Sequence, residues 1–290
     1  MIWIFEKITY LFDPLHHLWE HEKMHRKISL FLVVFFLVGL LLIELKRQGV
    51  ITGPVSEFIP YSHFAAIQKA FTFVLILEVI SLIFTLPCSF SRSVGKQFEL
   101  LALILLRNAF KELSYLPEPI SFLGNEQAVL RIVTDGFGAL IIFALLGIYY
   151  MIQQTKEGGQ DDTMHSADLF RFVAAKKGLS LLLLGAFAYM GLRSGYLNLM
   201  GIAHTDFLHD FYTVLILADV LVVLISQCFQ PGFYAVFRNS GFALSTMIIR
   251  IALAAPPFYN VLLGVAAAVF AILLTIVSRK LFAGKQFETH

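Results

Sequence analysis

Seven ionisable residues stand inside long apolar stretches of this sequence, where a charged side chain has few stable surroundings. They are Glu44, Glu78, Arg107, Arg131, Asp135, Asp219 and Arg250. A charge at the centre of a bilayer costs at least about 2.5–3.5 kcal/mol, so such residues usually face the protein interior and have a partner. These seven are therefore the first candidates for functional chemistry.

Glu78 and Asp219 lie near the middle of their apolar stretches, and Arg107 and Arg250 lie in the stretch that follows each acid. We interpret the two acids as sites that bind or relay a small ion or a proton, with the arginines as counter-charges. The alternative is that these groups form buried pairs that only orient helices. The arginines also lie toward the ends of their stretches, where a long side chain can reach the membrane surface.

The remaining three residues extend the predicted pathway. Arg131 and Asp135 are four residues apart, so on a helix they share one face and can pair with each other. Glu44 closes the first apolar stretch, where its carboxylate can reach water. The first half of the chain therefore holds more of the candidate chemistry than the second half.

A second group of candidates is rich in histidine. His21-Glu-Lys-Met-His25 matches the H-E-x-x-H pattern, in which two imidazoles on one helix face bind Zn²⁺ and the glutamate acts as a base. The potential metal ligands are His16, His17, His21, Glu22, His25 and His165. A zinc peptidase of the membrane would bury this motif in an apolar span, whereas here it lies among charged residues. A solvated helix beside the membrane is the simpler interpretation, and we predict no cofactor, with zinc as the alternative.

The composition indicates a membrane protein. Of 290 residues, 58% are hydrophobic and 14% are charged, compared with about 45–50% and about 25% in soluble domains. The net charge of +2 argues against nucleic-acid binding, which needs a concentrated basic face. The bilayer is thus the expected partner, together with other membrane subunits or further copies of the chain. No nucleotide-binding or hydrolase motif occurs, so an enzyme is not the expectation.

Eight stretches are long enough, at roughly 20 mostly apolar residues, to cross the hydrocarbon of a bilayer. The predicted spans are at about 28–45, 64–87, 97–114, 127–152, 177–195, 207–229, 233–254 and 257–279. The third and seventh are the weakest because each carries an arginine. The fold class is therefore all-α, a polytopic helical membrane protein.

The chain also contains a possible duplication. Residues 71–88 match residues 211–228 without a gap, and both contain the run Val-Leu-Ile-Leu. Asp13-x-x-His16 recurs as Asp162-x-x-His165. We predict two four-helix repeats, which run parallel because four spans bring the chain back to the same side. Duplicated membrane bundles often place a function at the interface between copies.

The expected organisation follows from these spans. The five predicted segments are a juxtamembrane helix (1–27), the first repeat (28–153), a cytoplasmic linker (154–176), the second repeat (177–282) and a cytoplasmic tail (283–290). Most of the 22 lysines and arginines fall on the side of the termini, so the positive-inside rule places both termini in the cytoplasm and the protein in the inner (plasma) membrane. The run Gly-Lys-Gln-Phe-Glu at 95–99 recurs at 284–288, either by chance or as a docking motif.

Three functions remain open at this point. The leading one is a transporter or channel-like protein for a small ion or protons. The second is a non-catalytic membrane subunit or scaffold, and the third is a membrane zinc peptidase.

Overall fold

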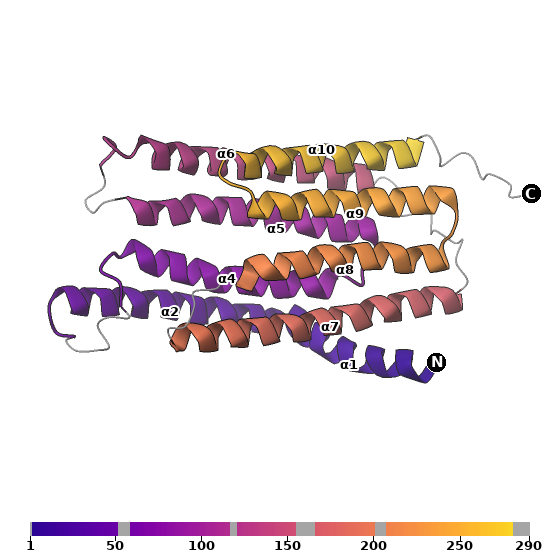
Figure 1. The fold of residues 1–290 in the computed structure, drawn as a ribbon, viewed down its shortest axis with the longest axis horizontal. Coiled ribbons are helices and arrows are strands. Elements are labelled where there is room, and N and C mark those ends of the chain that lie inside the picture. The colour runs from indigo at the N-terminus through magenta and orange to yellow at the C-terminus, as the bar shows by residue number, and fades with distance from the viewer. Residues whose placement is uncertain (1, 52–58, 117–120, 155–165, 201–206, 281–290) are drawn as a thin grey trace, which may run out of the picture.

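The computed structural model describes residues 2–51, 59–116, 121–154, 166–200 and 207–280 (Figure 1). Over these residues the chain is all-helical and forms no strand. The elements are α1 (Ile2–Glu20), α2 (Glu22–Arg47), α4 (Phe64–Thr85), α5 (Phe90–Glu112), a 3₁₀ turn (Leu113–Tyr115), α6 (Glu126–Gln154), α7 (Ser166–Leu199), α8 (Phe207–Phe229), α9 (Phe233–Ala254) and α10 (Tyr259–Lys280).

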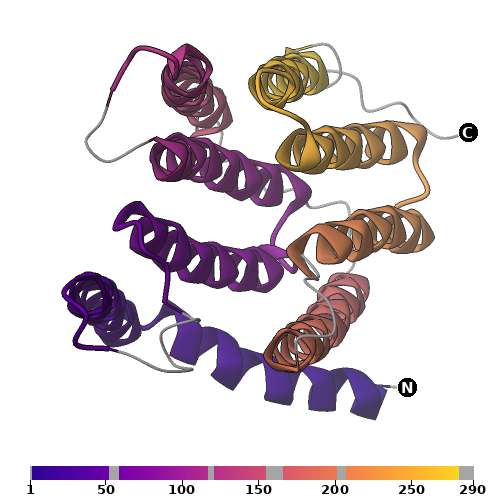
Figure 2. The same ribbon diagram turned by 60° about the vertical axis from the view of Figure 1, so that its left-hand side comes forward.

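The long helices form two rows of four (Figure 2). One row is α2, α4, α5 and α6, and the other is α7, α8, α9 and α10, with consecutive helices running in opposite directions. The rows contact each other where α5 meets α9, α6 meets α10 and α4 meets α7. We call the end of the rows at which α4 and α8 finish and α5 and α9 begin the Cys88 end. The beginning of α1 and the end of α10 also lie there (Figure 1).

Six of the helices are long and apolar enough to cross a bilayer, which indicates a multi-pass membrane protein. They are Glu22–Arg47, Phe64–Thr85, Glu126–Gln153, Asp168–Asn198, Asp210–Phe229 and Tyr259–Ser278. The eight-span prediction is thus confirmed only in part, because α5 and α9 do not belong to this set. Several of their polar residues face the protein: Gln97 and Arg107 of α5 and Asn239 and Arg250 of α9 are all buried.

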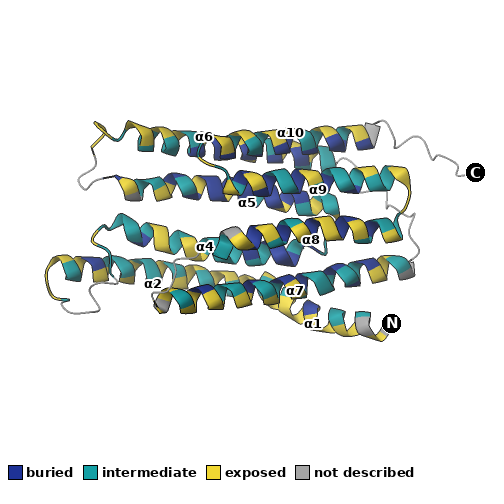
Figure 3. Ribbon diagram, in the orientation of Figure 1, coloured by how far each residue is buried: buried dark blue, intermediate teal, exposed yellow. Residues whose placement is uncertain are grey.

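Two apolar clusters form the core, while the outer faces of both rows expose further apolar side chains (Figure 3). The first cluster joins α5, α6, α9 and α10 and includes Phe98 and Ile142. The second joins α4, α5, α7 and α8 and includes Phe211 and Leu215. Small side chains at helix contacts let membrane helices approach closely, as they do along the buried alanines of α10.

Helix α1 leaves the direction of the rows and packs across them, against α7 and α2 (Figure 2). The chain turns at His21, whose extended backbone (φ −68°, ψ 122°) separates α1 from α2. Phe12 is 3% exposed and stacks on His16 while its ring tilts against Phe84. Asp13 accepts a hydrogen bond from Lys177 Nζ of α7 at 2.6 Å. The apolar contact thus joins the N-terminal helix to α4 of the first row, and the charged contact joins it to α7 of the second row.

The contact between α6 and α10 depends on Gly138. A Cβ at this position would lie 2.4 Å from Val261 Cγ2 and 2.7 Å from Cγ1. Because valine is stiff at χ1, it cannot move away cheaply. We expect Gly138→Ala to lower the free energy of unfolding by about 1–3 kcal/mol, measured by denaturant titration in mixed micelles.

Gly136 provides the matched control, since a Cβ there meets nothing within 4 Å. Gly136→Ala should be neutral or slightly stabilising because it lowers the entropy of the unfolded chain. Adding Val261→Ala should restore much of the stability of Gly138→Ala. Equal effects of the two glycine substitutions would contradict the packing described here.

Candidate functional site

Two buried ion pairs connect neighbouring helices within the two rows. In the first row, Arg107 Nη2 of α5 pairs with Glu78 Oε2 of α4. In the second row, Arg250 Nε of α9 donates to Asp219 Oδ2 of α8 at 2.7 Å. Thr246 Oγ1 lies 3.0 Å from the same oxygen. The structure therefore brings each mid-span acid together with an arginine of the next long helix.

Tyr212 of α8 interacts electrostatically with both ion pairs. Its side chain is buried in the second apolar cluster, and the interacting charges are those of Arg107, Arg250 and Glu78. Tyr212 precedes Asp219 by seven residues in α8, about 10 Å along the helix axis. A phenol both donates and accepts hydrogen bonds, so Tyr212 adds a polar group to the surroundings of the two pairs.

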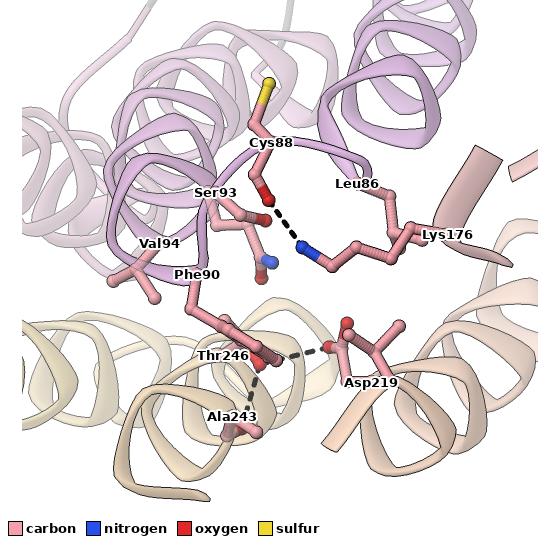
Figure 4. A pocket seen from close by; sticks show the side chains of 11 residues that line it. Leu86, Cys88, Phe90, Ser93, Val94, Lys176, Asp219, Ala243 and Thr246 are labelled. Atoms are coloured by element: carbon pink, nitrogen blue, oxygen red, sulfur yellow. Dashed lines mark hydrogen bonds between the residues drawn. The ribbon is translucent and has the colours of Figure 1, made fainter. Parts of the chain in front are cut away.

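Asp219 also lines an internal cavity, on the side of the Cys88 end (Figure 4). The cavity has a volume of about 20 Å³. One water needs about 10–15 Å³, so the cavity can hold a water molecule. It is lined by Leu86, Cys88, Phe90, Ser93, Val94, Gln97, Lys176, Asp219, Val222, Ala243 and Thr246. The cavity therefore lies between α5, α7, α8, α9 and the connection from α4 to α5, with polar groups set in a mainly apolar lining.

Lys176 of α7 extends into this cavity from the side opposite α5 (Figure 4). It is only 2% exposed, and its Nζ donates a hydrogen bond to the Cys88 carbonyl oxygen at 2.6 Å. The Nζ also lies 4.8 Å from the ring centroids of both Phe90 and Phe172. No carboxylate of the described residues is within ion-pair distance of it. Lys176 is thus a buried cation held by a carbonyl dipole and two aromatic faces.

Three buried polar atoms of the ion pairs and the cavity lining have no hydrogen-bond partner among the described residues: Arg107 Nη1, Arg250 Nη1 and Gln97 Oε1. Buried polar atoms are normally bonded, and an exception calls for an explanation such as a water or an ion. We call the set that carries these atoms the polar column, which comprises Glu78, Arg107, Tyr212, Asp219, Arg250, Thr246, Gln97, Ser93 and Lys176. Its members belong to α4, α5, α7, α8 and α9, and five of them line the cavity: Ser93, Gln97, Lys176, Asp219 and Thr246.

Three of the sequence-predicted pathway residues lie outside the polar column. Arg131 and Asp135 do not pair with each other as their spacing suggested. Arg131 Nη1 lies 3.7 Å from Glu112 Oε2, and Asp135 Oδ1 accepts a hydrogen bond from Asn260 Nδ2 at 3.0 Å. Tertiary partners on α5 and α10 thus replace the partner within the helix.

Glu44 lies near the end of α2 away from the Cys88 end. Its carboxylate accepts a hydrogen bond from Gln48 Nε2 at 2.8 Å and lies 3.3 Å from His63 Nε2. The side chain is half-exposed. Glu44 therefore belongs to a surface cluster and not to the polar column.

The histidine motif is divided by the turn at His21. His17 belongs to α1 and His25 to α2, and His21 Nδ1 accepts a weak hydrogen bond from the Lys23 amide at 3.3 Å. Glu22 begins α2, while His16 lies 3.5 Å from Glu20. His165 lies outside the described residues. Within the described residues, no three His, Cys, Asp or Glu side chains gather as metal ligands, and zinc stays the untested alternative to the prediction of no cofactor.

The first copy of Gly-Lys-Gln-Phe-Glu has a structural explanation. A Cβ on Gly95 would lie 2.7 Å from the Tyr150 ring, and Glu99 Oε1 accepts a hydrogen bond from the Tyr150 hydroxyl at 2.7 Å. Phe98 is in the core, and Gln97 lines the cavity. The second copy, at 284–288, lies outside the described residues.

Sequence reasoning missed five members of the polar column: Ser93, Gln97, Lys176, Tyr212 and Thr246. Lys176 adjoins Lys177 at the edge of an apolar stretch, which is typical of a basic pair at a membrane surface. A usable signal for Lys176 was its spacing of four residues from both Phe172 and Ser180, which places all three on one helix face. Because Phe172 is apolar, this face could have been predicted to turn toward the protein.

Comparison with protein-family models, with curated proteins and with solved structures finds no match. The function is therefore inferred from the chemistry of the polar column.

Proposed function

We propose that the protein carries protons or another small ion across a membrane along the polar column. The observation that supports this function is the position of Asp219, which pairs with Arg250 and also lines the cavity together with Lys176 and Gln97. A buried carboxylate beside a space that holds water can exchange its arginine partner for an entering proton or cation. A carboxylate enclosed by apolar side chains cannot.

The proposed architecture has eight spans in two parallel copies. Helices α5 and α9 cross the membrane too, sheltered by their neighbours, because their buried arginines are paired with α4 and α8. In favour of a duplication, both ion pairs join the second and third helices of a row of four. The proposal keeps both termini in the cytoplasm and places the protein in the inner (plasma) membrane.

The exchange at Asp219 is governed by charge balance. An unpaired carboxylate inside a membrane protein is costly, so Arg250 can leave Asp219 only when another positive charge arrives. A proton or a small cation entering from the cavity would meet this condition. Tyr212 then lies on the way from this pair to Glu78 and Arg107.

The test is ion flux in proteoliposomes that contain the purified protein. We expect Asp219→Asn, which keeps the shape of the side chain and removes its charge, to lower flux by at least about tenfold. Asp135→Asn is the matched control, because Asp135 is a buried acid outside the polar column that bonds to Asn260. The proposal is wrong if both variants keep wild-type flux or if both lose it equally in folded protein.

A specific observation favours a second candidate function. Both mid-span acids already have an arginine partner, as expected if the pairs only fix four helices in a membrane scaffold. Such a scaffold would bind other membrane subunits or further copies of the chain. Wild-type vesicles without flux, together with stoichiometric partners in gentle purification, would favour this function over transport.

A further inference from the structure

We propose that Lys176 transfers protons between the Cys88 end and Asp219, and that the transported ion is therefore the proton. This inference rests on the proposed function and narrows it to one ion. It assigns a chemical role to a lysine whose sequence position indicated only a surface charge.

The surroundings of Lys176 favour transfer over a fixed ion pair. Its Nζ uses one N–H on the Cys88 carbonyl and lies over the rings of Phe90 and Phe172. The facing acid is Asp219 of α8, which lines the same cavity but is not within ion-pair distance of Nζ. A carbonyl and aromatic rings stabilise an ammonium without holding it as tightly as a carboxylate would.

The size and charge of the cavity select the ion. About 20 Å³ holds a water but not a metal ion with its hydration shell. A bare metal cation would need several oxygen ligands, and here it would face the Lys176 ammonium. An anion would face the Asp219 carboxylate. A proton passed through a water avoids both conflicts, because no additional heavy atom enters the cavity.

The step balances without any co-reactant other than water. The Lys176 ammonium gives a proton to the cavity water as an N–H bond breaks, and the water gives a different proton to an Asp219 carboxylate oxygen as an O–H bond forms. The products are a neutral amine, a water and a neutral carboxylic acid. The amine still donates to the Cys88 carbonyl and regains a proton from the Cys88 end.

The decisive variant is Lys176→Arg, because arginine keeps the positive charge but does not lose its proton in proteins. We expect Lys176→Arg and Lys176→Met to lower proton flux in proteoliposomes by about a hundredfold. Lys177→Arg is the control, since this neighbouring lysine pairs with Asp13 instead. It should keep at least half of the wild-type flux.

The outcomes separate this inference from the proposed function. If Lys176→Arg keeps the proton flux of the wild type, the role of Lys176 is overturned and transport is left intact. The same conclusion follows if the wild-type protein transports Na⁺ or K⁺ but not protons. Wild-type vesicles without flux of any ion overturn both. If the variants do not fold, ¹⁵N NMR of lysine amines in the wild type gives the answer. One buried lysine should change from ammonium to amine below about pH 10, and a permanent ammonium contradicts the proposal.

Discussion

Replacing Arg250 by Met should lower the free energy of unfolding by about 3–5 kcal/mol. Arg250 is 1% exposed and provides the only ion pair of Asp219 among the residues that the structure describes. Methionine fills a similar volume, so the loss comes from the carboxylate left buried without a counter-charge. The measurement is denaturant unfolding in mixed micelles, where this change moves the equilibrium by about 10²- to 10⁴-fold.

The double variant Asp219→Leu/Arg250→Met tests the cause. Replacing a whole buried ion pair by apolar side chains is often neutral or stabilising, because neither charge must be desolvated. The double variant should therefore be more stable than Arg250→Met alone. It should still lack ion flux, because it has no Asp219 carboxylate. Equal instability of the single and double variants would show that Arg250 acts through packing.

Phe12→Ala should detach α1 from the rows, because it makes the docking of α1 less favourable by about 3–5 kcal/mol. Phe12 is 3% exposed and packs against His16 of its own helix and Phe84 of α4, so its removal leaves a cavity beneath α1. Hydrogen exchange should report the change, because the amides of α1 lose protection while those of α5 keep it.

Leu11 is the matched control for this substitution. It is adjacent in sequence but 58% exposed on the other face of α1. Leu11→Ala should leave the exchange of α1 within about twofold of the wild type, since little of its surface is buried on docking. Similar loss of protection in both variants would mean that α1 is held by its own helical stability and not by the Phe12 contact.

The sequence predicts the helices of this protein better than their membrane status. Hydropathy identifies the apolar helices because lipid and core both demand nonpolar side chains. It does not mark α5 and α9 as spans, because burial against other helices, unlike contact with lipid, permits charged residues such as Arg107 and Arg250. Hydropathy measures composition and does not distinguish these two environments.

Side-chain partners were predictable only where one arrangement dominated. The acids Glu78 and Asp219 had few arginines in reach, and the structure pairs them with those of the following helices. Asp135 had a partner four residues away, yet it bonds to Asn260, 125 positions later. Spacing along a helix says which groups share a face, but the neighbouring helix decides what that face contacts.

The docking of α1 also sets an order of assembly. The hydrogen bond that Lys177 donates to Asp13 joins residues 164 positions apart. Lys177 is therefore made long after α1. At about 5–20 residues per second, the ribosome needs roughly 8 to 30 s to bridge this interval. Throughout that time Asp13 has no Lys177 to bond, whereas Phe84, the aromatic contact of Phe12 on α4, has already been made. The docking of α1 is therefore completed only after the second row has begun to form.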